Sequence, residues 1–440
     1  MSDLRKKRLR AALLPTLLLA VLLFSAGCGE KAQPPEPDQP KPTAATPPPH
    51  VHEWQDGVCR GCGEICAHEW QDGVCTICGE SCVHDWRDGV CTICGMSCPH
   101  GRHDPESGLC EDCGMEAGHS YLNGSCTRCG AKPIFIDRLR GVPDALTIAA
   151  KKHGKTETFH YPLEEGEIVS GPHGTVSVED RKERDMVVYT PYGYDPEKQY
   201  NVVIMVPGAG HNAHFWMERL NRLGSAVGRV KGCELLDRLI EQGFVEPTIF
   251  VEVEYYLRGA PEEVAFYFTR DLRQRVLPFL AEHYGTYASV DERGELIAAP
   301  EHFGVAGASF GAMVCWQMLP ESTDLFSYWA LLAGAYNHEE EMAERINEGV
   351  SAEHPIHWLF AGDGKLAQGW SAYRNKLREL DESCACLEMD RNLSFIAVED
   401  TSHNFSSWDI GLINSLQVFF HSRYDPTQEP LVSSEQDKAS

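Results

Sequence analysis

Residues Phe303–Met318 read FGVAGASFGAMVCWQM, and they contain the pentapeptide Gly307-Ala308-Ser309-Phe310-Gly311. A G-x-S-x-G pentapeptide also arises by accident in a glycine-rich chain, so its neighbours must decide what it means. Phe303–Ala306 is a short apolar run typical of a buried strand, and the residues from Phe310 onward have the periodicity of an amphipathic helix. A serine on the sharp turn between such a strand and such a helix is exposed, and it can act as a nucleophile.

The chain around this stretch alternates short apolar runs with amphipathic runs from about Thr156 onward. This alternation predicts an α/β domain with a mostly parallel, doubly wound sheet and helices on both faces. The predicted strands are Asp185–Thr190, Asn201–Val206, Thr248–Val251, Phe303–Ala306, Tyr328–Leu332, Ile356–Phe360 and Ser394–Val398. The predicted helices are Cys233–Gln242, Val264–His283, Phe310–Met318, Glu339–Ile346, Gln368–Leu380 and Ile410–Phe420.

A nucleophilic serine in such a domain needs a carboxylate and a histidine later in the chain. His403 follows the last predicted strand and is the candidate general base. Asp363 is the first carboxylate at the end of the preceding strand, where it would orient the imidazole and stabilise the imidazolium. Asp400 and Glu399 are the alternative acids.

An oxyanion site needs backbone N–H groups near the carbonyl oxygen of the substrate. The N–H of Phe310, directly after the serine, is one candidate, and the N–H of Ala209 in the turn after strand Asn201–Val206 is the other. His211 and His214 follow this turn, and we interpret them as residues that line the pocket rather than metal ligands.

Five motifs occur in order along this part of the chain: YTPYGYDPEKQYNVVIMVPGAG, LPFLAEHYG, GVAGASFGA, LLAGAY and SHNFSSW. Together they resemble the esterase D or putative-esterase family, which includes enterochelin esterases and the feruloyl and acetylxylan esterases of carbohydrate esterase family one. The resemblance covers roughly Val187–Tyr424. It implies an α/β-hydrolase fold with Ser309 as nucleophile, His403 as general base and no catalytic cofactor. Pro207 stands where the family commonly has His, and an ungapped match places Lys365 where relatives often carry the Asp.

Five cysteine-rich repeats precede this domain. They read HEWQDGVCRGCGEIC (repeat one), HEWQDGVCTICGESC (repeat two), HDWRDGVCTICGMSC (repeat three), HDPESGLCEDCG (repeat four) and HSYLNGSCTRCG (repeat five). Two thiolates in C-x-x-C converge on one tetrahedral ion, and the glycine that follows relieves the tight turn. The predicted ligand sets are His50, His52, Cys59 and Cys62; Cys66, His68, Cys75 and Cys78; Cys82, His84, Cys91 and Cys94; Cys98, His103 (or His100), Cys110 and Cys113; and the incomplete set His119, Cys126 and Cys129.

Disulfides are the alternative for these cysteines, because export to an oxidising compartment favours pairing. The repeats hold 13 of the 18 cysteines, an odd number that cannot pair completely, and a disulfide framework does not need a histidine at a fixed position. We therefore expect structural zinc, which would supply most of the folding free energy of such short repeats and take no part in catalysis.

The N-terminus predicts export. A basic segment is followed by the apolar run Ala11–Phe24 and then by Ser25-Ala26-Gly27-Cys28. These small residues before a cysteine resemble a bacterial lipobox, so we expect lipidation of Cys28 and attachment to the outer face of the cell membrane; a plain signal peptide is the alternative. Gly29–Pro49 contains eight prolines and is expected to be an extended spacer.

The predicted domain plan has six parts: a lipoprotein-type signal peptide (1–28), a proline-rich linker (29–49), the zinc-binding repeats (50–131), a second linker (132–155), the esterase domain (156–425) and a disordered tail (426–440). The net charge of −26 argues against nucleic-acid partners. The predicted function is an extracytoplasmic serine esterase that removes hydroxycinnamoyl or acetyl groups from plant polysaccharide. The alternatives are a siderophore esterase and a cell-surface binding protein with a degenerate hydrolase domain, and the sequence gives no oligomeric state.

Overall fold

The computed structural model describes residues 52–55, 58–71, 74–84, 86–87, 90–94, 109–112, 114, 118–139, 147–162, 168–171, 174–177, 183–209, 211–220, 226, 230–255, 260–336 and 339–428. The predicted signal peptide, the spacer, the lipidation site Cys28 and four predicted ligands (His50, Cys98, His103 and Cys113) lie outside these residues, as does the alternative ligand His100. Of the helices in the described part of the chain, none is long and apolar enough to cross a membrane.

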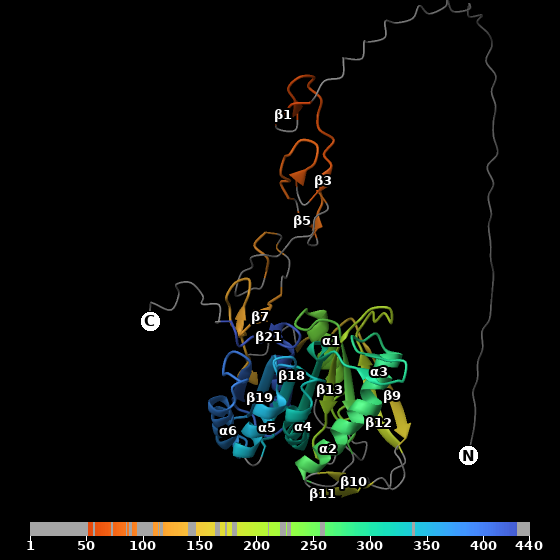
Figure 1. The fold of residues 1–440 in the computed structure, drawn as a ribbon, viewed down its shortest axis with the longest axis vertical. Helices are drawn as coiled ribbons and strands as arrows, with labels where there is room; N and C mark the ends of the chain where they lie inside the picture. The colour runs from red at the N-terminus through yellow and green to blue at the C-terminus, as the bar shows by residue number, and fades with distance from the viewer. Residues whose placement is uncertain are drawn as a thin grey trace, which may run out of the picture. The chain divides into compact units, whose positions relative to one another are not determined.

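The main sheet has eight strands, and it forms the centre of the region that we call the α/β domain, residues 155–428 (Figure 1). Six neighbouring strands are parallel, and the two at one edge are antiparallel. In spatial order the strands are β20 (Leu393–Val398), β19 (Trp358–Gly364), β18 (Tyr328–Leu332), β17 (Phe303–Ala308), β13 (Asn201–Val206), β14 (Thr248–Val253), β12 (Glu183–Thr190) and β9 (Lys155–Pro162). The predicted mostly parallel α/β sheet is therefore confirmed.

Seven α-helices occur among the described residues, and they cover both faces of the sheet. They are α1 (Gly232–Glu241), α2 (Pro261–Asp271), α3 (Leu277–His283), α4 (Phe310–Met318), α5 (Glu339–Gly349), α6 (Trp370–Ser383) and α7 (Phe405–Leu416). Two short antiparallel hairpins, β10 (Ile168–Gly171) with β11 (Gly174–Ser177) and β15 (Ser289–Val290) with β16 (Leu296–Ile297), lie outside the main sheet.

The two faces of the sheet bury two separate hydrophobic clusters. Strand β13 shows the alternation directly, because Val202 and Ile204 belong to the first cluster and Val203 and Met205 to the second. Helices α2 to α6 contribute to the first cluster, and α1 and α7 to the second. Both faces are therefore covered, which explains why the central strands are apolar at nearly every position.

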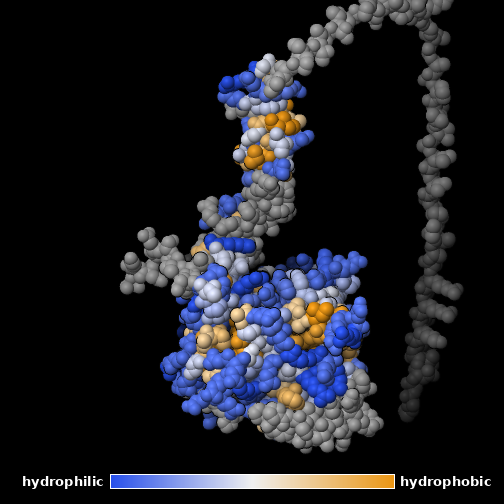
Figure 2. Space-filling view, in the orientation of Figure 1, coloured by the Kyte–Doolittle hydropathy of each residue, from blue (hydrophilic) through white to orange (hydrophobic). Residues whose placement is uncertain are grey.

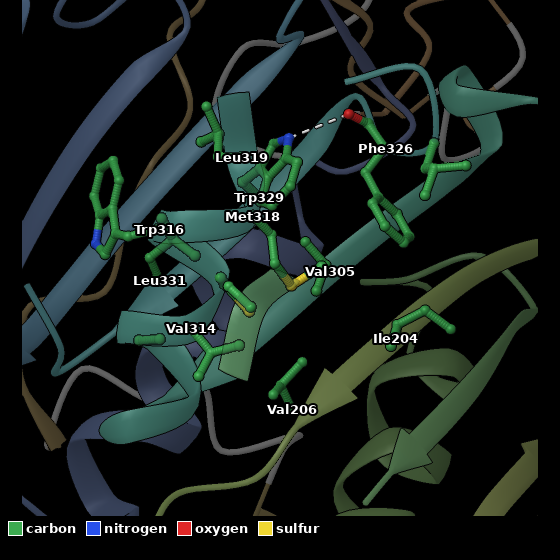
Figure 3. Close-up of a cluster of buried hydrophobic side chains, with 14 of the residues drawn as sticks. Ile204, Val206, Val305, Val314, Trp316, Met318, Leu319, Phe326, Trp329 and Leu331 are labelled. Carbon is green, nitrogen blue, oxygen red and sulfur yellow. Dashed lines mark hydrogen bonds between the residues drawn. The ribbon is translucent and has the colours of Figure 1, made fainter. Parts of the chain in front are cut away.

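Helix α4 lies at the centre of the first cluster, which Figure 3 shows in close-up. Met318 points from α4 toward Val305 of β17, and the indole N–H of Trp329 donates to the carbonyl of Phe326 at 3.2 Å. Each large apolar side chain that is fully buried here contributes roughly 1.5–3 kcal/mol. The sequence predicted an amphipathic helix, but α4 is buried on nearly all sides because it also packs against α2.

Some boundaries differ from the prediction. The predicted helix Val264–His283 is divided by a π-helical turn, Leu272–Val276, which lies between α2 and α3. Helix α7 begins five residues earlier than expected because the Asn404 side chain accepts a hydrogen bond from the N–H of Ser406 and caps the helix. Edge strand β9 was not predicted.

Repeats one, two, three and five each form a small hairpin of two short strands. The strands are β1 (Trp54–Gln55) with β2 (Val58–Cys59), β3 (Trp70–Gln71) with β4 (Val74–Cys75), β5 (Trp86–Arg87) with β6 (Val90–Cys91), and β7 (Tyr121–Leu122) with β8 (Ser125–Cys126). Apolar residues of the repeats, among them Ile65 and Val83, are exposed, and hydrophobic patches are visible on the repeats in Figure 2. Hairpins of this size cannot bury a core of their own.

Two compact units can be distinguished in the chain. One consists of the residues up to His68 together with Thr76–Glu80, and the other of Glu69–Cys75 together with the chain from Ser81 onward. Repeat five therefore belongs to the same unit as the α/β domain. Within that unit, β7 pairs with the short C-terminal strand β21 (Ser422–Arg423).

Candidate active site and cysteine-histidine clusters

Ser309 occupies the turn between β17 and α4, with φ 56° and ψ −120°. A residue with a side chain in this region of backbone space carries strain of roughly 1–3 kcal/mol. The turn is held by a hydrogen bond of 2.8 Å from the Ser309 N–H to the carbonyl of Leu332 on the neighbouring strand β18. The serine thus lies at the carboxyl end of the parallel strands, as the sequence predicted.

The two glycines of the pentapeptide are required by close contacts. A Cβ atom at Gly307 would lie 2.6 Å from the carbonyl oxygen of Gly311, and one at Gly311 would lie 2.4 Å from that of Val206. Real Cβ atoms do not approach backbone oxygens so closely, and here the neighbouring atoms belong to backbone that cannot move aside. The G-x-S-x-G spacing therefore allows α4 to pack directly against the strands.

His403 lies in the loop between β20 and α7, and its Nε2 is 2.9 Å from Ser309 Oγ. The loop is fixed on both sides of the histidine. Thr401 Oγ1 donates to the carbonyl of Val398 at 2.9 Å, and Ser407 Oγ donates to the carbonyl of Ser402 at 2.8 Å. The edge of the imidazole faces Trp408, with ring centroids 5.2 Å apart.

Asp363 is the penultimate residue of β19, and only 7% of its surface is exposed. Burial raises the pKa of its carboxyl group, while the N–H of Gly364, 2.7 Å from Oδ1, and the charge of His403 act in the opposite direction. The Asp363 carboxylate accepts its hydrogen bond from Gly364, and it interacts with His403 through charge alone. Its negative charge therefore lies where it can act on the imidazole.

The alternative acids have other contacts. Glu399 forms an ion pair with Lys365, and its N–H donates to the carbonyl of Asp137 at 2.7 Å. Asp400 has a positive φ of 55° in the turn after β20. Lys365, which the ungapped match places at the acid position, is thus engaged with Glu399. Among the candidates, Asp363 is the one with an electrostatic interaction with His403.

The turn after β13 lies against the serine. A Cβ atom at Gly208 would be 3.4 Å from Ser309 Cβ, so this turn and the first residue of α4 approach the same point. The N–H groups of Ala209 and Phe310, both proposed as oxyanion donors, belong to these two segments. The N-terminus of α4 adds the partial positive charge of its helix dipole there.

Comparisons with known proteins agree with this geometry. No family model matches the chain. In structure it is similar to the feruloyl esterase module from Clostridium thermocellum, solved in complex with sinapinate, with a TM-score of 0.50, 23% identity, and coverage of 67% of this chain and 98% of that one. The fold is that of an α/β hydrolase. A ferulic acid esterase from Anaeromyces mucronatus has a TM-score of 0.47 at 17% identity, covering 66% of this chain and 99% of that one.

In sequence, the chain is 27% identical to endo-1,4-beta-xylanase Y from Acetivibrio thermocellus over 268 residues. The match covers 58% of this chain and 23% of the xylanase, so the chain spans about a quarter of that relative's length. These comparisons confirm the resemblance to esterases that the motifs indicated.

The two histidines that follow the turn after β13 have different surroundings. His211 stacks on Phe215 with ring centroids 3.8 Å apart, and its Cδ2 is 3.6 Å from the position of a Cβ on Gly208. Burial lowers the pKa of His211, which favours a neutral imidazole beside the serine. His214 instead lies 3.2 Å from a carboxylate oxygen of Glu218 and 3.6 Å from one of Asp185. His211 thus lies near the nucleophile, and His214 faces acidic residues.

Tyr255, which the sequence analysis did not single out, also belongs to the site. Its hydroxyl donates to the carbonyl of Pro207 at 2.8 Å, and its ring stacks on Phe310 with centroids 5.9 Å apart. This tyrosine therefore links the two segments that carry the predicted oxyanion donors. Its position two residues after strand β14 was the available signal, because side chains at the carboxyl ends of parallel strands converge on the site.

Four groups of cysteine and histidine side chains come together in the described part of the repeats, each with ligand atoms within 4.8 Å of one another. Two of the predicted four-residue sets are complete, and two others contain three described members. The groups are Cys66, His68, Cys75 and Cys78; Cys82, His84, Cys91 and Cys94; His52, Cys59 and Cys62; and His119, Cys126 and Cys129. Cys110 of repeat four is buried.

The distances within these groups fit a tetrahedral metal. Sulfur and nitrogen ligands at zinc bond lengths are about 3.3–3.8 Å apart. The distances from Cys Sγ to His Nδ1 are 3.7 Å for Cys62 and His52, 3.4 Å for Cys78 and His68, 3.5 Å for Cys94 and His84, and 3.8 Å for Cys129 and His119.

His52 and His68 also make the same contact with their second ring nitrogen, Nε2. His52 Nε2 lies 3.8 Å from Glu64, and His68 Nε2 lies 4.0 Å from Glu80. A carboxylate on the second ring nitrogen is the usual partner of a metal-bound histidine, because it fixes the tautomer in which Nδ1 is the ligand. The same nitrogen thus faces the thiols in each group.

Proposed function

We propose that the protein is a serine carboxylic-ester hydrolase. The observation that carries this proposal is the 2.9 Å contact between His403 Nε2 and Ser309 Oγ, on a strained turn at the carboxyl end of the sheet. Strain of this kind persists at functional sites because the surrounding structure holds it in place. A purely structural serine needs neither a positive φ nor a histidine at hydrogen-bond distance.

In this proposal Ser309 Oγ attacks the ester carbonyl while His403 takes the hydroxyl proton. The N–H groups of Ala209 and Phe310 stabilise the oxyanion, and Asp363 stabilises the imidazolium. His403 then gives its proton to the leaving alcohol, and an acyl-enzyme remains on Ser309. A water molecule, deprotonated by His403, attacks the acyl group, so that the acid is released and the serine is restored.

Labelling with a fluorophosphonate probe tests this proposal. The probe should react with Ser309 in the wild-type chain, and neither Ser309→Ala nor His403→Ala should be labelled. A binding protein with a degenerate hydrolase domain would give no labelling in the wild type. Labelling of Ser309→Ala at the wild-type rate would also contradict the assignment.

For the substrate we propose an acyl group on plant polysaccharide, hydroxycinnamoyl or acetyl. Support comes from the likeness in sequence to a protein named as a xylanase and in fold to a feruloyl esterase module. The test compares release of ferulate and acetate from arabinoxylan with hydrolysis of a catecholate trilactone. Preference for the trilactone would favour a siderophore esterase instead.

We further propose that the repeats bind structural zinc and that the chain is exported and lipid-anchored through Cys28. Zinc accepts the mixed thiolate and imidazole donors of these groups, and a filled tetrahedral site has no open position for catalysis. Export would place the esterase where it meets polymers that the cell cannot import. Metal analysis of reductively purified protein and mass spectrometry of the mature N-terminus test these two statements.

A further inference from the structure

Repeat five differs from the other repeats in how it is bound. Its strand β7 pairs in parallel with the C-terminal strand β21, and β7, β8 and β21 form one three-stranded sheet (Figure 1). The N–H of Tyr121 donates to the carbonyl of His421 at 2.7 Å, and the N–H of Asn123 donates to that of Arg423 at 3.0 Å. The hairpin of repeat five is thus an extension of the C-terminal segment of the α/β domain.

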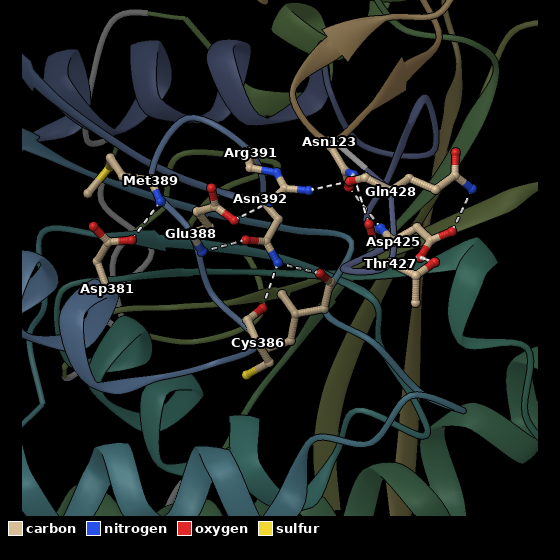
Figure 4. A network of polar contacts seen from close by, with 11 residues as sticks. Asn123, Asp381, Cys386, Glu388, Met389, Arg391, Asn392, Asp425, Thr427 and Gln428 are labelled. Carbon is tan, nitrogen blue, oxygen red and sulfur yellow. Dashed lines mark hydrogen bonds and ion pairs between the residues drawn. The ribbon is translucent and has the colours of Figure 1, made fainter. Parts of the chain in front are cut away.

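Asn123, at the tip of this hairpin, is the centre of the contact (Figure 4). Its Nδ2 donates to the carbonyls of Asp425 and Gln428, both at 2.8 Å, and its Oδ1 accepts from the N–H of Asp425 at 2.8 Å. Only 1% of Asn123 is exposed. All polar atoms of the amide group are therefore used in a buried contact with backbone groups.

The sequence of repeat five matches this contact. Repeats one to three have aspartate at the corresponding position: Asp56, Asp72 and Asp88. A carboxylate has no N–H to donate, so at position 123 it would face two buried carbonyl oxygens without a hydrogen bond. The exchange of aspartate for asparagine thus occurs in the repeat where a donor is needed.

Packing supports the same conclusion. Tyr121 and Cys126 are buried in the second hydrophobic cluster, together with Trp358 and other residues of the sheet and of α7. The hairpin turn approaches the α/β domain so closely that a Cβ atom on Gly124 would lie 2.0 Å from the carbonyl oxygen of Asp390. No other residue type fits at this turn without moving the backbone.

The chain that follows repeat five reaches the segment that carries His403. Ile136 and the Asn414 side chain on α7 exchange two hydrogen bonds of 2.8 Å. The carbonyl of Asp137 accepts from the N–H of Glu399 at 2.7 Å. His403 lies between Glu399 and Asn414, so both sides of the catalytic loop are tied to the segment after the hairpin. These residues had been predicted as part of a linker.

The side chains of His119, Cys126 and Cys129 come together at this hairpin, with ligand atoms within 4.8 Å of one another. His119 precedes β7, Cys126 ends β8, and Cys129 lies in the turn after it, so one ion would join both strands. Cys126 is both a predicted ligand and a fully buried member of the second cluster. The sets of repeats one to three have a fourth ligand two residues before the histidine, where repeat five has Ala117.

We propose that repeat five is a metal-dependent part of the catalytic domain, and that zinc at His119, Cys126 and Cys129 stabilises the C-terminal segment and the His403 loop. The ion fixes the hairpin, the hairpin binds residues 421–428, and the segment after it holds residues 399 and 414. This inference rests on the proposed metal binding and is independent of the proposed esterase activity. It differs from the predicted domain plan, in which the repeats (50–131) and the second linker (132–155) lie outside the esterase domain (156–425).

The test uses the full chain, purified with zinc under reducing conditions. The variant is Cys126→Ser with Cys129→Ser, and the matched control is Cys91→Ser with Cys94→Ser, which removes two thiols from a complete set in repeat three. Zinc content, thermal unfolding and amide hydrogen exchange of peptides covering residues 393–404 and 418–428 are measured. These readouts report the fold even in a chain with no esterase activity.

Both variants should lose one zinc per chain. We expect roughly tenfold faster exchange in both peptides for the repeat-five variant alone, because its opening no longer requires release of a metal. Its main unfolding transition should fall by at least about 5 °C. Unchanged exchange and unfolding in this variant would overturn the proposal, and so would an equal effect of the repeat-three variant.

A second pair of variants leaves every ligand in place. Gly124→Ala introduces a Cβ at 2.0 Å from Asp390, whereas Gly79→Ala has nothing within 4 Å, and both glycines have φ +76°. The two substitutions therefore carry the same local backbone strain and differ in the contact. Faster exchange of residues 418–428 in Gly124→Ala alone supports the proposal, and identical exchange in the two variants overturns it.

Discussion

His403 Nε2 lies 2.9 Å from Ser309 Oγ, although 94 residues separate them in the chain. The two residues meet because the parallel strands β17 and β20 end at the same edge of the sheet, and each is followed by a loop at that edge. The serine is held by the strained turn before α4, and the histidine by the cap of α7. Their contact therefore depends on two separate elements that are both anchored in the core.

Replacement of the nucleophile is the first prediction. Ser309→Ala should lower kcat for p-nitrophenyl acetate by roughly 10⁴-fold or more, because the acyl-enzyme can no longer form. Alanine removes only the hydroxyl, so circular dichroism and thermal unfolding should match the wild type. Turnover within a factor of ten of the wild type would assign the chemistry to another residue.

The identity of the acid is the second prediction. Asp363→Asn should lower kcat by about 10³–10⁴-fold, because the imidazolium formed during attack loses the nearby charge. Asp400→Asn is the matched control, since it makes the same change of charge in the loop that carries His403. The assignment of Asp363 fails when the two variants have equal activity, or when Asp400→Asn is the slower enzyme.

Metal content is the third prediction. Cys78→Ser should reduce the zinc content of the reductively purified chain by about one ion, because three remaining donors bind zinc less tightly than four. Cys386→Ser is the control: this half-buried thiol lies outside the four cysteine-histidine groups. Esterase activity should be unchanged in both. Equal zinc contents in the two variants, or disulfides found by mass spectrometry, would contradict structural zinc in repeat two.

The fourth prediction concerns acid stability. Burial lowers the pKa of His357 to about 4, whereas an imidazole in the unfolded chain has a pKa of about 6.5. Between these two values the unfolded chain binds more protons than the folded one. The stability that comes from keeping His357 neutral is thus fully present above about pH 6.5, and up to about 3 kcal/mol is lost as the pH falls toward 4.

His357→Asn removes this titration and keeps an acceptor for the N–H of Tyr424, which lies 3.2 Å from His357 Nδ1. In urea unfolding, the free energy of the variant should therefore fall less steeply between pH 6.5 and 4 than that of the wild type. The nearby charges of Glu301 and Arg423 have opposing effects on this pKa and are present in both proteins. Parallel pH profiles would show that another group causes the acid sensitivity.

Several features of the fold could be predicted from the sequence because they depend on neighbours along the chain. The strand, turn and helix around Ser309 follow from an apolar run, two glycines and a second apolar run within 16 residues. The cysteine-histidine groups follow from spacings of a few residues. His403 could be proposed because a residue that follows the last strand of a parallel sheet lies at the carboxyl edge of the sheet, where Ser309 also lies.

Other features were decided by contacts between distant parts of the chain. Three carboxylates were candidates for the acid, and their contacts follow from the tertiary structure: Asp363 interacts electrostatically with His403, whereas Glu399 forms an ion pair with Lys365. Helix α4 is buried on nearly all sides because α2 lies against it. The pattern of apolar residues in α4 does not predict this contact.

Repeat five shows the same division most clearly. The spacing of its histidine and cysteines is local, so the sequence by itself determined that these side chains come together at one place. That Asn123 meets Asp425, 302 residues later, was decided only by the tertiary structure. Asparagine is common in turns for local reasons, so its presence at position 123 does not predict a distant partner. The contact forms only because the folded chain brings the backbone carbonyl groups next to its side-chain amide.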